Sequence, residues 1–200
     1  VGSAGAAFNK RTGELLWENG KDVCGYATPV PATIDGNEGV VLCGADSIFG
    51  LGIEDGRELW RHPFFNKHRA TDADAIVHDD EVFVSSAYGR GCAKVRISRG
   101  QVMEVFDNTV MRNLQSCCVL WKGYLYGFDE KFFKCIDFED SREQWLARGM
   151  GHGSVTMCSD GRMIVMSDKG EMVIAKANSK SFEVIARAQV LPRSMCRTVP

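Results

Sequence analysis

Short apolar runs alternate with polar turns along the whole chain, and one arrangement of them recurs. Each copy has an apolar stretch, a turn with an acidic residue and often Gly, and a run that ends in Trp. Clear copies lie at 7–17, 51–60 and 134–145, and weaker ones at 94–106 and 175–186. The copies follow one another at steps of roughly 40–45 residues, which is typical of the four-stranded blade of a β-propeller.

The segments between these copies divide into short β-like runs, which predict an all-β fold. In the first complete repeat we expect four strands, at 25–34, 39–44, 47–54 and 57–62. Asp35-Gly36 and Asp55-Gly56 are tight-turn dipeptides between them. Further repeats are expected at about 72–106, 114–147 and 151–189. Glu183 to Leu191 has some helix propensity, but its place in the repeat favours an outer strand.

Partial blades are expected on both sides of these four complete blades, at 2–19 and 195–200. No linker-like segment rich in Ser and Gly interrupts the pattern, so we expect one domain over 1–200. An open set of blades leaves strand edges unpaired. We therefore expect self-association, or closure of 2–17 on the C-terminal segment.

The Trp at the end of each clear copy has a physical role in this interpretation. Blades pack face to face, and a large ring on an outer strand fills the gap to its neighbour. Gly13 and Gly56, four positions before Trp17 and Trp60, suit turns that require a positive φ.

Composition and charge exclude several functional classes. The formal net charge is −2 and the basic residues are scattered, so no electrostatic footprint for nucleic acid is present. No apolar stretch reaches the roughly 20 residues of a membrane-spanning helix. No basic-then-apolar signal segment is visible in this chain either.

Several segments together resemble the PQQ-like β-propeller repeat family of bacteria, which includes quinoprotein dehydrogenases and an outer-membrane assembly lipoprotein. Residues 12–17 and 55–60 resemble its Trp-docking motif. Residues 85–91, 124–129, 148–154 and 186–191 are similar to a subgroup described only as PQQ-like repeat proteins. The resemblance implies seven or eight blades, so we expect this chain to be part of a longer propeller. It is specific for the fold and does not by itself define the function.

The eight cysteines include no Cys-x-x-Cys pair, so a zinc ribbon is not expected. Cys43, Cys135 and Cys158 lie in apolar runs and are expected to be buried thiols. The adjacent pair Cys117-Cys118 is expected in an inner strand, with the two side chains on opposite faces. The resemblance offers another interpretation, because quinoprotein alcohol dehydrogenases hold a vicinal disulfide against PQQ. The flanking residues here differ from that pattern.

Other candidate chemistry has an ordinary structural interpretation. Asp72, Asp74 and Asp129 are the candidate acids, and each is expected to serve as a turn or cap residue. The Gly-rich segment 149–154 precedes a β-like run and not a helix, so it is expected to connect two blades and not to bind phosphate. The four histidines are too far apart in sequence for a local metal pair, and no metal site is expected.

The remaining candidate site is the mouth of the central channel, where inner strands and their loops converge. The residues expected there are Tyr26, Asp72, Asp74, Asn113, Gln115, His152 and Arg197.

We expect a non-catalytic, periplasmic or secreted scaffold that has a protein partner and no cofactor. The alternative is a quinoprotein dehydrogenase that uses PQQ and calcium to oxidise an alcohol or a sugar. A third hypothesis is carbohydrate or peptide binding at the channel mouth.

Overall fold

The computed structural model describes residues 5–19, 23, 25–64, 66–68, 71–193 and 195–196. Every regular element in these residues is a β-strand, which confirms the all-β prediction. None of the described residues belongs to a helix that could cross a membrane. Most of the predicted partial blade at 195–200 lies outside the described residues, as does Cys24.

Two compact units make up the chain, and each is described by itself. The first contains residues 1–84 and 93–107, and the second contains residues 85–92 and 108–200.

The strands up to Asn108 form one two-stranded sheet and two four-stranded sheets. The two-stranded sheet consists of β1 (Gly5–Phe8) and β2 (Leu15–Asn19). The next sheet consists of β3 (Val30–Ile34), β4 (Asn37–Cys43), β5 (Ser47–Gly52) and β6 (Glu58–Pro63). The third consists of β7 (Ile76–His78), β8 (Glu81–Ser86), β9 (Gly91–Ser98) and β10 (Gln101–Asn108).

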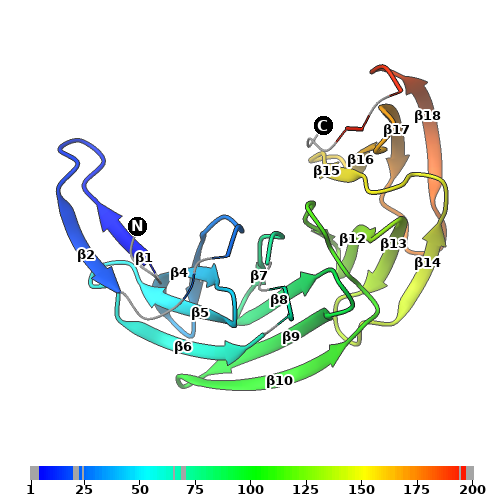
Figure 1. Ribbon diagram of the computed structural model, residues 1–200. Helices are drawn as coiled ribbons and strands as arrows, with labels where there is room; N and C mark the ends of the chain where they lie inside the picture. The colour runs from blue at the N-terminus through cyan, green and yellow to red at the C-terminus, as the bar shows by residue number, and fades with distance from the viewer. Residues whose placement is uncertain are drawn as a thin grey trace. The chain divides into compact units, whose positions relative to one another are not determined.

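The strands from Val119 onward lie in the second unit and form two more four-stranded sheets. The first consists of β11 (Val119–Trp121), β12 (Tyr124–Asp129), β13 (Phe132–Asp137) and β14 (Glu143–Ala147). The second consists of β15 (Ser154–Met157), β16 (Arg162–Met166), β17 (Glu171–Lys176) and β18 (Glu183–Gln189). Within each sheet the strands lie side by side in chain order, as Figure 1 shows. The four complete repeats expected from the sequence are thus four sheets, and 183–189 is a strand as predicted.

A β-bulge recurs at one position of the repeat. The register between the last two strands shifts immediately before Trp17, Trp60 and Trp145, which pair with Ala7, Gly50 and Cys135. The same shift occurs before Ala186, which pairs with Ile174. Ala186 therefore occupies the place of the Trp in its sheet, which accounts for the weak fifth copy of the pattern. A bulge increases the local twist and changes the direction of the side chains around it.

Trp rings connect one sheet to the next within each unit. In the first unit, Nε1 of Trp17 on β2 donates to the carbonyl of Ile53 (2.9 Å), and its ring lies directly over Gly56. In the second unit, Nε1 of Trp145 on β14 donates to the carbonyl of Asn178 after β17 (2.7 Å). The turn glycines have the predicted positive φ, 76° at Gly13 and 67° at Gly56.

Each unit has its own apolar core. In the first unit, Trp60 is buried in a cluster that includes Val41 and Ile48 of its own sheet and Val82 and Val95 of the next. In the second unit, Phe133, Trp145 and Phe182 form mutual ring contacts with centroids 5.2–5.6 Å apart. These clusters extend from one sheet to the following one, as the packing role of the rings requires.

The first strand of the first complete repeat is shorter than predicted. It begins at Val30 and not at residue 25, because the backbone N–H groups of Tyr26 and Ala27 donate to the carbonyl of Thr71 (3.0 and 3.1 Å). The N–H of Thr28 donates to the Asp74 carboxylate instead of to a neighbouring strand. The segment before β3 is therefore fastened to the loop 71–74.

Candidate binding cleft

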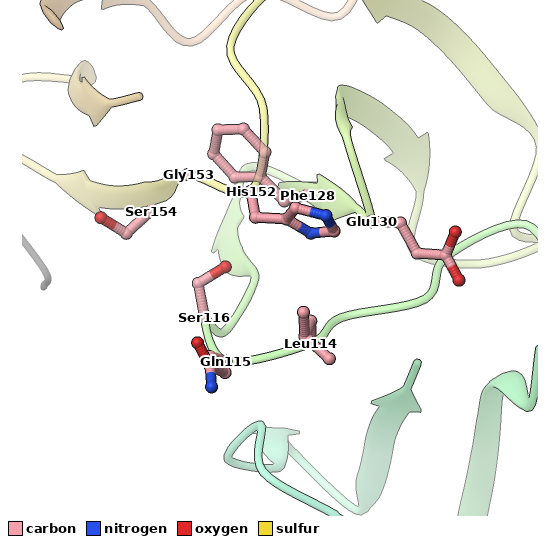
Figure 2. Close-up of a pocket in the computed structure, with 8 residues that line it drawn as sticks. All are labelled: Leu114, Gln115, Ser116, Phe128, Glu130, His152, Gly153 and Ser154. Atoms are coloured by element: carbon pink, nitrogen blue, oxygen red, sulfur yellow. The ribbon is translucent and has the colours of Figure 1, made fainter. Parts of the chain in front are cut away.

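A small cleft that opens to solvent lies between β12 and β15 in the second unit. Figure 2 shows the side chains around it, with the His152 imidazole extending toward the same side as Glu130. Its lining comes from the loop before β11, the end of β12 and the start of β15: Leu114, Gln115, Ser116, Phe128, Glu130, His152, Gly153 and Ser154. Two of the residues predicted for the channel mouth, Gln115 and His152, are therefore brought together here.

The glycines around His152 determine where its side chain lies. Gly151 has φ 64°, and the N–H of His152 donates to the Asp168 carboxylate (3.1 Å). A Cβ on Gly153 would lie 2.4 Å from Cζ of Phe128, so only Gly allows the chain to pass so close to β12. This segment connects β14 to β15 without a helix, as expected from the sequence.

His152 contributes an unsatisfied polar atom to the cleft. Among the described residues, its Nδ1 is buried and has no hydrogen-bond partner. Buried polar atoms in folded proteins are almost always paired, and an ordered water is one partner that could satisfy this atom. The hydroxyl-bearing Ser116 and Ser154 line the same cleft. The cleft can therefore exchange hydrogen bonds with a polar group while Leu114 and Phe128 cover apolar parts.

Asn113 lies beneath the cleft and does not line it. It is only 2% exposed, its Nδ2 donates to the carbonyl of Phe128 (3.0 Å), and its Oδ1 accepts from the thiol of Cys118 (3.2 Å). Its backbone N–H donates to Oγ of Ser85 (2.9 Å). Asn113 thus fixes the loop that carries Gln115 and Ser116 against the end of β12.

The other predicted channel residues lie elsewhere. Tyr26, Asp72 and Asp74 belong to the first unit, where Tyr26 is 82% exposed and Asp74 accepts the N–H of Thr28. Burial raises the pKa of Asp72 above its ordinary value. Arg197 lies outside the described residues.

Asp129 is the centre of a buried ion-pair network, a role that differs from the turn or cap expected for it. Its carboxylate, 1% exposed, accepts from Nε of Arg112 (2.6 Å) and lies 2.7 Å from Nζ of Lys134. Lys134 also pairs with Glu143 (3.0 Å). The hydrogen bond that Arg112 donates to the Asp129 carboxylate, strengthened by the charge of that carboxylate, raises the pKa of Arg112. A carboxylate held by two cations is not available as a base.

Cys117 and Cys118 are both thiols, and the structure corrects their predicted position. They precede β11, which begins at Val119, and do not lie within an inner strand. Cys118 is buried against Gly127, where a Cβ would lie 2.4 Å from its Sγ. Burial raises the pKa of the Cys118 thiol despite the hydrogen bond to Asn113. The Cys118 thiol is enclosed by these neighbours. It is therefore not placed to form a vicinal disulfide that would lie against a PQQ ring.

Within the described ranges, the histidines and cysteines do not come together as a metal site. His62 approaches Glu104 (Nε2 to Oε2, 3.7 Å), and His78 approaches Asp79 (Nε2 to Oδ2, 3.9 Å). No group of three or more His, Cys, Asp or Glu residues in the described part of the chain could hold a metal ion. Cys43 and Cys135 are buried thiols as predicted, whereas Cys158 is only half-buried.

Consecutive four-stranded sheets joined through Trp contacts place this chain in the β-propeller class. A family model described as outer membrane protein assembly factor BamB matches residues 1–147, and the chain belongs to this family of PQQ-like repeats. This match therefore confirms the predicted repeat family and the predicted fold.

Two solved structures show the same fold. BamB from Moraxella catarrhalis matches with a TM-score of 0.71 and 16% identity over 92% of this chain. The computationally designed Ika8 protein matches with a TM-score of 0.67 and 13% identity over 96% of this chain. The match covers 57% of the length of each of these two structures. No curated protein sequence matches the chain.

Proposed function

We propose that this chain is part of a non-catalytic propeller that binds a protein partner as a scaffold in the bacterial envelope. The observation that carries the proposal is membership, over residues 1–147, of a family described as an outer membrane protein assembly factor. A periplasmic location follows from the same relationship and is part of the proposal.

The cleft between β12 and β15 is the proposed contact for the partner. A peptide segment presents N–H and C=O groups together with apolar side chains, and the cleft offers both kinds of contact. Gln115, Ser116 and Ser154 supply polar side chains, whereas Leu114 and Phe128 are apolar. The buried carboxylate of Asp129, next to the lining residue Glu130, is neutralised by Arg112 and Lys134.

Site-specific photo-crosslinking in the source organism tests the proposal. A photoreactive amino acid at Gln115, which is exposed on the cleft, is expected to capture one defined envelope protein. Gln101 on β10 is also exposed and serves as the matched control position, where the same adduct should be absent. Adding His152→Ala to the Gln115 probe should weaken the adduct severalfold.

Two outcomes would contradict the proposal. One is an identical set of adducts from Gln115 and Gln101, or none from either. The other is reduction of added PQQ, in the presence of calcium, that depends on an alcohol or a sugar, because this would establish catalysis.

A further inference from the structure

A second hollow in the same unit lies at the opposite end of β12 from the cleft. Its volume is about 300 Å³. One wall is aromatic, with Trp121 at the end of β11 and Tyr124 and Tyr126 on β12. The facing wall is polar and comes from the end of β17 and the start of β18, with Lys176, Asn178 and Glu183. We call this hollow the aromatic groove.

The aromatic wall is held in place by its surroundings. A Cβ on Gly161 would lie 3.2 Å from Cζ2 of Trp121, so the bare glycine backbone lies close to the indole ring. Nζ of Lys122 lies 5.7 Å from the centre of the same ring. Trp121 and Tyr124 are each half-buried and pack against the core of the unit. Both rings are therefore ordered and still border open space.

The polar wall is ordered and nearly neutral. Nζ of Lys176 pairs with Oε1 of Glu183 (2.7 Å), and Nδ2 of Asn178 donates to Oε2 of the same carboxylate (3.2 Å). The ion pair cancels the charge of Lys176, while its ammonium keeps further donors for a ligand. The hydroxyl-bearing Ser179 extends this wall.

We propose that the aromatic groove binds a neutral saccharide chain. A pyranose ring has an apolar C–H face, which stacks on an aromatic ring, and hydroxyl groups around its edge, which hydrogen-bond to amides, carboxylates and ammonium groups. The groove presents these two surfaces on facing walls, and Lys122, which also lines it, supplies a further ammonium donor for hydroxyl groups.

Calorimetric titration of the intact chain with maltohexaose, cellohexaose and chitohexaose tests this proposal. At least one hexasaccharide should bind saturably, and saturation-transfer NMR should show contact with the aromatic protons. Trp121→Leu should weaken binding about tenfold, the loss expected for one aromatic stacking contact. Gln101→Ala, at an exposed position of β10 that lines neither the cleft nor the groove, is the control and should leave the affinity unchanged.

Tyr124→Leu and Glu183→Gln provide independent variants should Trp121→Leu fail to fold, and each should weaken binding severalfold. The proposal is wrong if no hexasaccharide saturates the intact chain. It is also wrong if folded variants of the groove bind as well as the unchanged chain, or if extended peptides compete for the site more tightly than saccharides.

Discussion

Two glycines at equivalent turn positions, Gly13 and Gly56, differ in what lies beside them. Both have positive φ, but a Cβ on Gly56 would lie 2.4 Å from the Trp17 ring, whereas nothing lies within 4 Å of one on Gly13. The same sequence pattern thus has a backbone role at Gly13 and an additional packing role at Gly56.

Substituting these glycines by Ala separates the two roles. Gly13→Ala should lower the free energy of unfolding by about 1–2 kcal/mol, the cost of a left-handed backbone for an L-residue. Gly56→Ala should cost a further 1–3 kcal/mol or so, because the methyl group overpacks against Trp17. Urea unfolding of both variants provides the measurement. Equal losses would show that the Trp17 ring does not lie on Gly56.

Asp129 provides a second prediction at the scale of the residue. Asp129→Asn removes the charge that Arg112 and Lys134 share in a buried site, so it should destabilise the chain by about 3–5 kcal/mol. Asp160→Asn is the control, since its ion pair with Arg162 is exposed and should leave the urea midpoint unchanged. Similar midpoints for the two variants would contradict the buried network.

At the scale of the element, the predictions that depend on local chemistry were the accurate ones. Asp35-Gly36 forms a positive-φ turn between strands, and Gly56 also has a positive φ, as their sequences indicate. The first strand was predicted too long because a distant carbonyl, that of Thr71, holds the N–H groups of Tyr26 and Ala27. Thr71 is distant in sequence from these residues, so the periodicity of the chain does not indicate this contact.

Trp60 tests the packing of sheet on sheet. It is 5% exposed, lies across from Gly50 and belongs to a core that two sheets share. Trp60→Ala should therefore cost about 3–5 kcal/mol, through lost burial and the cavity that remains. Trp17 is half-buried, so Trp17→Ala should lower the free energy of unfolding by less than Trp60→Ala does. A urea-midpoint shift near zero for Trp60→Ala would contradict the packing role.

The ion pairs between β8 and β9 predict that the stability of the chain depends on pH. Desolvation acts to raise the pKa of Glu81, but hydrogen bonds and charges from Lys94 and Arg96 together lower it below its ordinary value of 4.5. A carboxylate with a lowered folded-state pKa contributes stability above its unfolded pKa and loses it as the pH falls. Stability should therefore decrease as the pH falls below about 4.5, and Glu81→Gln should flatten that decrease. An unchanged acid limb in Glu81→Gln would contradict this role.

At the scale of the whole molecule, the repeat could be predicted from the sequence, but the candidate site could be predicted only in part. Gln115 and His152 were expected at the channel mouth and share a cleft, whereas Asn113 is buried beneath it. Ser116 and Phe128 line the cleft without a distinguishing sequence signal. Their place in the lining depends on how closely the glycines beside His152 bring two sheets together, which strand periodicity does not reveal.

Residue-resolved hydrogen exchange of the native chain tests the central claim most directly, namely that each repeat is one four-stranded sheet. Strands hydrogen-bonded on both sides should exchange slowest, so protection should peak at β4–β5, β8–β9, β12–β13 and β16–β17. The outermost strands β10 and β18 should exchange faster. Four maxima at the spacing of the Trp repeat are the predicted result. A single protected block without that period, or protection with a helical period, would contradict the account.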